Sequence, residues 1–185
     1  MLNTLSVIGE KLNDHGVLWG VGASILLSQY GLVNRPNDID ILVAVDDVER
    51  VDEILSSLGE RKPWEADENY ATKFFLEYVI NGIDVDVMAG LTIHHSEGTF
   101  EYTFDKASVS RWVKIKGVAI PFTSMEDWYV IYQLIPGRVE KVMMIEHYLH
   151  DKGIKQPELL KRMMRCNLPD EVREKINNLL AFHGR

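Results

Sequence analysis

The sequence has a single cysteine, Cys166, so no disulfide bond can form within the chain. It also lacks any apolar run near the roughly 18 residues that a membrane-spanning helix needs. Residues 1–5 have no basic stretch of the kind that opens a secretory signal, and they predict the start of a helix instead. These absences favour a cytoplasmic protein with no membrane span.

Basic residues are scarce as well. The chain has 20 Lys and Arg against 28 Asp and Glu, which gives a net charge of −8. Proteins that hold long nucleic acids neutralise phosphates with Lys and Arg, so we do not expect DNA or RNA as a partner. Residues 1–122 carry 10 of the basic and 19 of the acidic residues. This imbalance fits a site that gathers metal cations, or a cationic substrate, or a surface that is merely well solvated.

The pattern of apolar residues changes along the chain. Residues 1–122 mix helical and strand-like periods, whereas residues 123–185 contain helical stretches only. We therefore predict an α+β fold, with a mixed β-sheet flanked by helices over residues 1–122 and a C-terminal helical region over residues 123–185. The total of 185 residues suits one domain with such an appendage.

Two turns organise the predicted strands. Asn81-Gly82 separates the β-type runs 74–80 and 83–88, and this dipeptide is a strong hairpin signal because both turn residues need positive φ. Lys116-Gly117 predicts a second turn, within the β segment 110–122. We expect the neighbouring histidines His94 and His95 to lie in a loop.

A pair of acids opens the predicted strand 38–45. Residues i and i+2 of a strand point to the same face, so Asp38 and Asp40 lie side by side while Ile39, Ile41 and Val43 face the core. Two carboxylates this close repel each other unless a cation neutralises them, and hard oxygen ligands suit Mg²⁺. The alternative is a pair of solvated acids at the end of a strand.

A second apolar strand repeats the alternation with Asp84 and Asp86. If the two strands are neighbours, one of these carboxylates lies beside the first pair. Three carboxylates on adjacent strands can hold two metal ions, which would act on both the attacking and the leaving oxygens of a phosphoryl transfer.

The third element is the glycine-rich turn at residues 20–24, between a predicted strand and a short helix. Gly22 permits close approach of the backbone to a phosphate, and the Ser24 hydroxyl can donate a hydrogen bond. The alternative is a tight turn that packs a helix on a sheet.

In this order, the three elements resemble the polymerase-β-like nucleotidyltransferase superfamily. The similarity is greatest to its small bacterial members, the antibiotic nucleotidyltransferases and the nucleotidyltransferase-like toxins. The matching stretches are Trp19-Gly20-Val21-Gly22-Ala23-Ser24, Arg35-Pro36-Asn37-Asp38-Ile39-Asp40-Ile41-Leu42-Val43, Val85-Asp86-Val87-Met88 and, at the entry to the helical region, Ile120–Trp128.

The resemblance implies transfer of a nucleoside monophosphate from a nucleoside triphosphate to a hydroxyl acceptor, with release of pyrophosphate. Asp38 and Asp40 would bind two Mg²⁺ ions, and Asp86 would complete the catalytic metal site at the nucleophile. Asp84 is the rival for this third position, and Asp86 is preferred because Val85, Val87 and Met88 match the family strand.

Nucleoside triphosphate is the implied co-substrate, and Gly22, Ser24 and Arg35 are its implied contacts. A small hydroxylated acceptor is favoured over a macromolecule. The resemblance also leaves a partner protein or a homodimer open.

Two departures from the family pattern keep other functions open. Ala23 stands where the family has a second glycine, and Asn37 where it has threonine. They motivate the alternative of an inactive module that binds a nucleotide or a partner protein. A third reading is the toxin component of a toxin–antitoxin pair.

Overall fold

The computed structural model describes residues 1–63 and 71–183 and shows a seven-stranded mixed sheet with the order β3-β4-β5-β2-β1-β9-β8. β2 runs parallel to β5 and β1 parallel to β9, and the other pairs are antiparallel. The strands are β1 (Trp19–Val21), β2 (Ile39–Val43), β3 (Glu60–Arg61), β4 (Phe74–Ile80), β5 (Ile83–Ala89), β8 (Arg111–Ile115) and β9 (Val118–Phe122).

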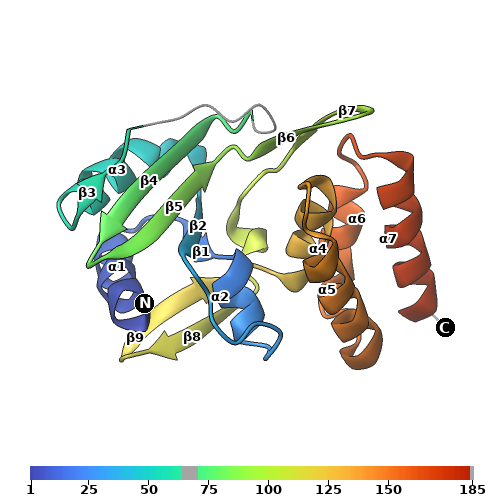
Figure 1. Cartoon of the computed structure of the whole chain (residues 1–185), viewed down its shortest axis with the longest axis horizontal. Helices are drawn as coiled ribbons and strands as arrows, with labels where there is room; N and C mark the ends of the chain where they lie inside the picture. Colours follow the sequence, from blue (N-terminus) through green and yellow to red (C-terminus); the bar gives the residue numbers. More distant parts are fainter. Residues whose placement is uncertain (64–70, 184–185) are drawn as a thin grey trace.

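Helices flank the sheet and form the C-terminal part of the chain. In Figure 1 the sheet lies at one end of the molecule and α4 to α7 lie at the other. The helices are α1 (Leu2–Asp14), α2 (Ala23–Ser28), α3 (Val48–Ser56), α4 (Met125–Leu134), α5 (Val139–Lys152), α6 (Pro157–Met163) and α7 (Asp170–His183), with 3₁₀ turns η1 (Val45–Asp47) and η2 (Lys106–Ser108). The predicted α+β class is thus confirmed. No helix in the described ranges is both long and apolar enough to cross a bilayer.

The hairpin at Asn81-Gly82 is confirmed. Asn81 and Gly82 have φ of 52° and 71°, the left-handed values that a tight two-residue turn between twisted strands needs. This turn fixes the register of β4 and β5, in which Phe75 lies opposite Met88 and Glu77 opposite Asp86. The positions of the acids along the sheet follow from that register.

β2 lies at the centre of the sheet, between β5 and β1. Ile39, Ile41 and Val43 are fully buried on one face, as the alternation predicts. The strand is shorter than the predicted 38–45, so Asp38 lies just before its first residue. A strand with such an apolar face can carry charged groups only at its end, where a cavity reaches them.

A second, two-stranded sheet joins the main sheet to the C-terminal helices. It consists of β6 (Thr92–His95) and β7 (Gly98–Glu101) and reaches toward the connection between α6 and α7 (Figure 1). His95 Nε2 lies 3.3 Å from the backbone oxygen of Asn167, and the Asp170 amide donates to Glu97 Oε2 at 3.1 Å. The expected loop at His94 and His95 was therefore wrong, because both residues pair within this hairpin.

The C-terminal helical region begins at a side-chain N-cap. Ser124 caps α4, since its Oγ accepts a hydrogen bond from the Asp127 amide at 2.9 Å. β9 ends at Phe122 and α4 begins at Met125, so the chain passes directly from sheet to helix. The division into units 1–122 and 123–185 stays a prediction.

Trp128 attaches α4 to the turn after β1. Its Nε1 donates to Thr123 Oγ1 at 2.8 Å, and that hydroxyl donates to the Val21 carbonyl at 3.0 Å. The indole lies against Gly22, where an added Cβ would come within 2.2 Å of Trp128 Cζ2. Gly22 is thus required by packing between the sheet and α4.

We predict that Gly22→Ala lowers the free energy of unfolding by about 1–3 kcal/mol, because the new Cβ overlaps the indole. Denaturant unfolding measures the loss. In a Trp128→Phe background, which removes the indole atoms nearest to Gly22, most of the loss should disappear. An equal loss in both backgrounds would show that backbone conformation, and not the indole, requires the glycine.

Candidate metal site

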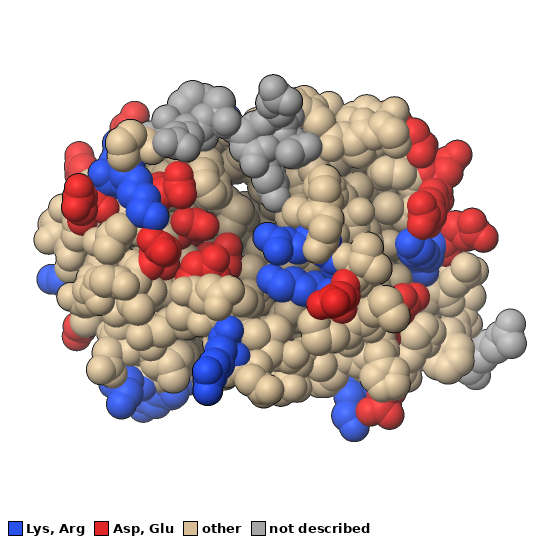
Figure 2. Space-filling model, in the orientation of Figure 1, with Lys and Arg blue, Asp and Glu red and all other residues tan. Residues whose placement is uncertain are grey.

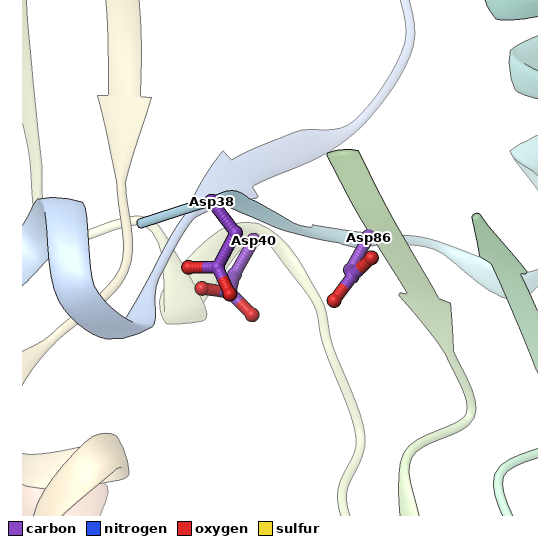
Figure 3. A group of neighbouring side chains, drawn as sticks. All are labelled: Asp38, Asp40 and Asp86. Atoms are coloured by element: carbon purple, nitrogen blue, oxygen red, sulfur yellow. The ribbon is translucent and has the colours of Figure 1, made fainter. Parts of the chain in front are cut away.

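Three aspartates meet where β2 and β5 run side by side. The parallel register places Asp40 directly beside Asp86, and Asp38 precedes Asp40 by two residues on the same face. One carboxylate oxygen from each of the three lies within 4.8 Å of the other two. Figure 3 shows Asp38 and Asp40 together on one strand with Asp86 facing them from the next. We call Asp38, Asp40 and Asp86 the aspartate triad.

Asp84, the rival third acid, has different surroundings. It is exposed and forms an ion pair with Lys62 at 2.6 Å. The group of carboxylates close enough to share a cation contains Asp86. The register of β2 and β5 thus separates two acids that strand alternation alone leaves equivalent, and it brings Asp86, the preferred candidate, beside Asp38 and Asp40.

Burial and the charges of neighbouring carboxylates both act on the triad. Burial raises the pKa of Asp40 to about 8, with further increases from the charges of Asp38 and Asp86, while Lys141 acts in the opposite direction. Burial also raises the pKa of Asp86 to about 6, with contributions from Glu77 and Asp38. Half-buried carboxylates in this state favour a divalent cation, whose binding would displace their protons. The donor set is all carboxylate oxygen, which fits a hard ion such as Mg²⁺.

The glycine-rich turn lies against the triad. Ser24 Oγ donates to Asp38 Oδ1 at 3.2 Å, and the Gly22 amide donates to the Asp40 carbonyl at 3.0 Å. Ala23, between them, has φ of +44°, a left-handed conformation that is strained for a residue with a Cβ. The turn therefore holds the strand that carries two of the acids. Contact of Gly22 or Ser24 with a triphosphate stays a prediction.

A cavity of about 230 Å³ opens beside the triad. The three aspartates and Ala23 line it together with Arg138, Lys141 and a set of apolar side chains. In Figure 2 a group of acidic side chains faces a group of basic ones across a hollow. The main apolar contributors to the wall are Phe75, Met88, Leu91, Trp128, Ile131 and Ile135.

Two cations lie in this cavity that the sequence interpretation missed. Lys141 is half-buried, and burial together with the Arg138 charge lowers its pKa, whereas Asp40 and Asp38 raise it. Its Nζ donates to the Tyr132 hydroxyl at 3.3 Å and lies 4.9 Å from the centre of that ring.

Arg35, the predicted phosphate contact, is exposed and is not among the cavity residues. Its role stays a prediction.

The positions of Arg138 and Lys141 in the sequence could have indicated their role in the site. Arg138 and Lys141 lie at the N-cap and in the first turn of α5. The helix dipole disfavours positive charge at that end, so cations placed there need another reason. A cavity that holds anionic groups supplies one.

The raised pKa of Asp40 gives a prediction for the metal-free protein. Between about pH 4 and pH 8 the folded chain keeps a proton on Asp40 that the unfolded chain has released. Stability should therefore fall as pH rises through this window, and Asp40→Asn should remove the part of the fall that is due to Asp40, leaving a smaller fall between about pH 4 and pH 6 from Asp86. We expect the variant to be more stable than the wild type by about 1–3 kcal/mol at pH 8 and nearly equal at pH 4.

Denaturant unfolding at pH 4, 6 and 8 in the presence of a chelator measures the difference. Asp84→Asn, at an exposed carboxylate, is the matched control and should show no gap that grows with pH. A gap for Asp40→Asn that does not change with pH would contradict the assigned charge state.

Comparison of the chain with known proteins identifies its fold. No protein-family model matches the chain, and no curated protein matches its sequence. A candidate nucleotidyltransferase from Thermotoga maritima superposes with a TM-score of 0.62 and 28% identity, over 81% of this chain and 92% of that one.

Two antibiotic-modifying proteins show the same fold at lower identity. ANT(2″)-Ia, in complex with adenylyl-2″-tobramycin, has a TM-score of 0.57 and 13% identity over 97% of both chains. The lincosamide antibiotic adenylyltransferase LnuA, bound to lincomycin, has a TM-score of 0.52 and 14% identity over 78% of this chain and 95% of that one. The chain thus has the polymerase-β-like nucleotidyltransferase fold, with an aspartate triad typical of a metal-binding catalytic site.

Proposed function

We propose that the protein is a metal-dependent nucleotidyltransferase. It would move a nucleoside monophosphate from a nucleoside triphosphate to a hydroxyl group of a small acceptor and release pyrophosphate. The observation that carries this proposal is the aspartate triad, whose carboxylate oxygens lie within 4.8 Å of one another at the wall of a cavity. The fold alone would not support it, because one fold hosts many functions.

The triad would hold the metal. Asp38, Asp40 and Asp86 are the proposed ligands of Mg²⁺, and two ions fit the number of carboxylate oxygens. Bound Mg²⁺ would neutralise the developing charge on the phosphate oxygens. The Ser24 hydroxyl, bonded to Asp38 at 3.2 Å, orients that carboxylate.

The triphosphate would lie between the glycine-rich turn and the start of α5. Gly22, Ser24 and Arg35 are the contacts implied by the family resemblance. Lys141 and Arg138 support this placement, because they are the cations that line the cavity beside Asp38 and Asp40. Cations so placed would attract a polyanion and then fix its position.

Asp86 would act on the acceptor. It lies on the β5 side of the triad, beside Asp40, and as a carboxylate it would accept a proton from an acceptor hydroxyl placed there. The hydroxyl oxygen would attack the α-phosphorus, and the bond from that phosphorus to the bridging oxygen would break. The proton would go to Asp86 and the electron pair to pyrophosphate.

A small acceptor is favoured over a macromolecule. ANT(2″)-Ia and LnuA, which share the fold, are described with an adenylylated tobramycin and with lincomycin, respectively. The acidic charge of the chain disfavours long nucleic acid. We therefore propose a hydroxylated molecule of antibiotic size.

A binding module without turnover is the second candidate. Ala23 favours it, since this residue has a strained φ of +44° and lines the cavity that would receive the triphosphate. Such a module would bind a nucleoside triphosphate with Mg²⁺ and release no pyrophosphate.

Transfer is tested with each α-labelled nucleoside triphosphate, Mg²⁺ and a panel of hydroxylated acceptors that includes tobramycin and lincomycin. We expect label in an acceptor with the wild type, a loss of about 10³-fold in Asp40→Asn, and near wild-type transfer in the control Asp84→Asn. Equal transfer by Asp40→Asn would remove the triad from the mechanism. Triphosphate binding without any transfer would favour the module.

A further inference from the structure

The order of the strands indicates on which side of the aspartate triad the leaving group and the acceptor would lie in the proposed reaction. Nucleotidyl transfer places the attacking oxygen and the leaving pyrophosphate on opposite sides of the α-phosphorus. From β1 to β4, the face presents the glycine-rich turn, then Asp38 and Asp40, then Asp86, then the side chains of β4. The two ends of this row are candidates for the leaving group and the acceptor.

The leaving-group end is the one nearer β1. Ser24 bonds Asp38 there, and Lys141 interacts with Asp40 and Asp38. A pyrophosphate held at this end puts the attacking hydroxyl on the other side of Asp86, over β5 and β4. The body of the acceptor must then lie on the side chains of these two strands.

That part of the wall is apolar. Phe75 lies opposite Met88 in the register of β4 and β5, so both side chains lie on the face that carries Asp86. Met88 is two residues after Asp86 on the same strand, and Leu91 extends the apolar wall. Phe75 is half-buried, which leaves part of its ring available to a ligand.

Glu77 borders this wall, next to the ion pair of Lys62 and Asp84, whose charges also act on Asp86. Glu77 lies directly opposite Asp86 on β4, two residues from Phe75 and on the same face. It is half-buried and lies outside the triad. A carboxylate at the rim of an apolar wall suits a single cationic group better than a polycation.

We propose that the acceptor is an amphipathic molecule with an apolar, ring-containing body on Phe75 and Met88, its reacting hydroxyl at Asp86 and at most one cationic group at Glu77. This inference rests on the proposed function and adds the substrate class. It differs from the expectation, drawn from net charge alone, of a cationic acceptor. A nucleobase over the same wall is the competing occupant.

The first step of the test separates this inference from the proposed function. Calorimetry measures binding of the α,β-methylene analogues of ATP, GTP, CTP and UTP with Mg²⁺ to the wild type, and the analogue that binds is then titrated into Phe75→Ser and Phe74→Ser. Phe74 is the matched control, because it is the neighbouring half-buried aromatic residue on β4 and points to the opposite face. We expect the three affinities to agree within about twofold. If the wild type binds no analogue, the proposed function fails and the inference fails with it.

The second step uses three probes in the presence of Mg²⁺ and the analogue. Tyramine has a ring and one amine, 2-phenylethanol has a ring and no charge, and glucosamine has an amine and no apolar body. Saturation-transfer NMR should detect both ring probes on the wild type and on Phe74→Ser. Their binding should weaken at least fivefold in Phe75→Ser, and glucosamine should bind at least fivefold more weakly than tyramine.

Glu77→Gln should weaken tyramine and leave 2-phenylethanol unchanged. Phe75→Leu keeps the apolar volume without the ring, and it replaces Phe75→Ser if the serine variant fails to fold; a threefold loss of the ring probes is then expected. Equal loss in the Phe74 and Phe75 variants, preferred binding of glucosamine, or loss of the analogue in Phe75→Ser would overturn the proposal. The last result would assign the wall to the nucleobase.

Discussion

The repulsion among three carboxylates at one point of the sheet is the constraint on which the rest of the site depends. Asp40 and Asp86 are adjacent because β2 and β5 pair in parallel, and apolar residues that are buried on both strands, among them Ile39, Ile41, Val85 and Val87, stabilise that pairing. Burial is the main reason that the pKa values of Asp40 and Asp86 are raised, and the neighbouring carboxylates raise both values further. A divalent cation at this point would offset the repulsion, and the register of the two strands brings its proposed ligands together.

The helical region completes the site from the opposite side. Trp128 packs on Gly22 and thereby fixes α4 against the turn that carries Ser24. Tyr132, one turn later on α4, receives a hydrogen bond from Lys141 of α5. A chain of packing therefore connects the glycine-rich turn to the lysine that interacts with the triad. Loss of one contact in this series, such as that between Trp128 and Gly22, would change the position of Lys141 as well as lower the free energy of unfolding.

The sequence predicts those features of the structure that are set by residues adjacent in the chain. The hairpin at Asn81-Gly82 and the buried face of β2 follow from local chemistry, and both are present. The choice between Asp84 and Asp86 could not be made from alternation, because both occupy the same face and only the register with β2 distinguishes them. Lys141 was missed because its position depends on packing between α5 and a sheet formed far earlier in the chain. β6, predicted as a loop at His94 and His95, was missed because its residues pair with β7 and contact the connection between α6 and α7.

Calorimetric titration of nucleoside triphosphates, with and without Mg²⁺, tests the central claim most directly. It requires the wild type and the double variant Asp38→Asn/Asp40→Asn, and it needs no knowledge of the acceptor. The account predicts binding that depends on Mg²⁺ and is lost in the double variant, whose fold is preserved. Binding that is the same without Mg²⁺, or that survives in the double variant, would contradict a metal site at the aspartate triad.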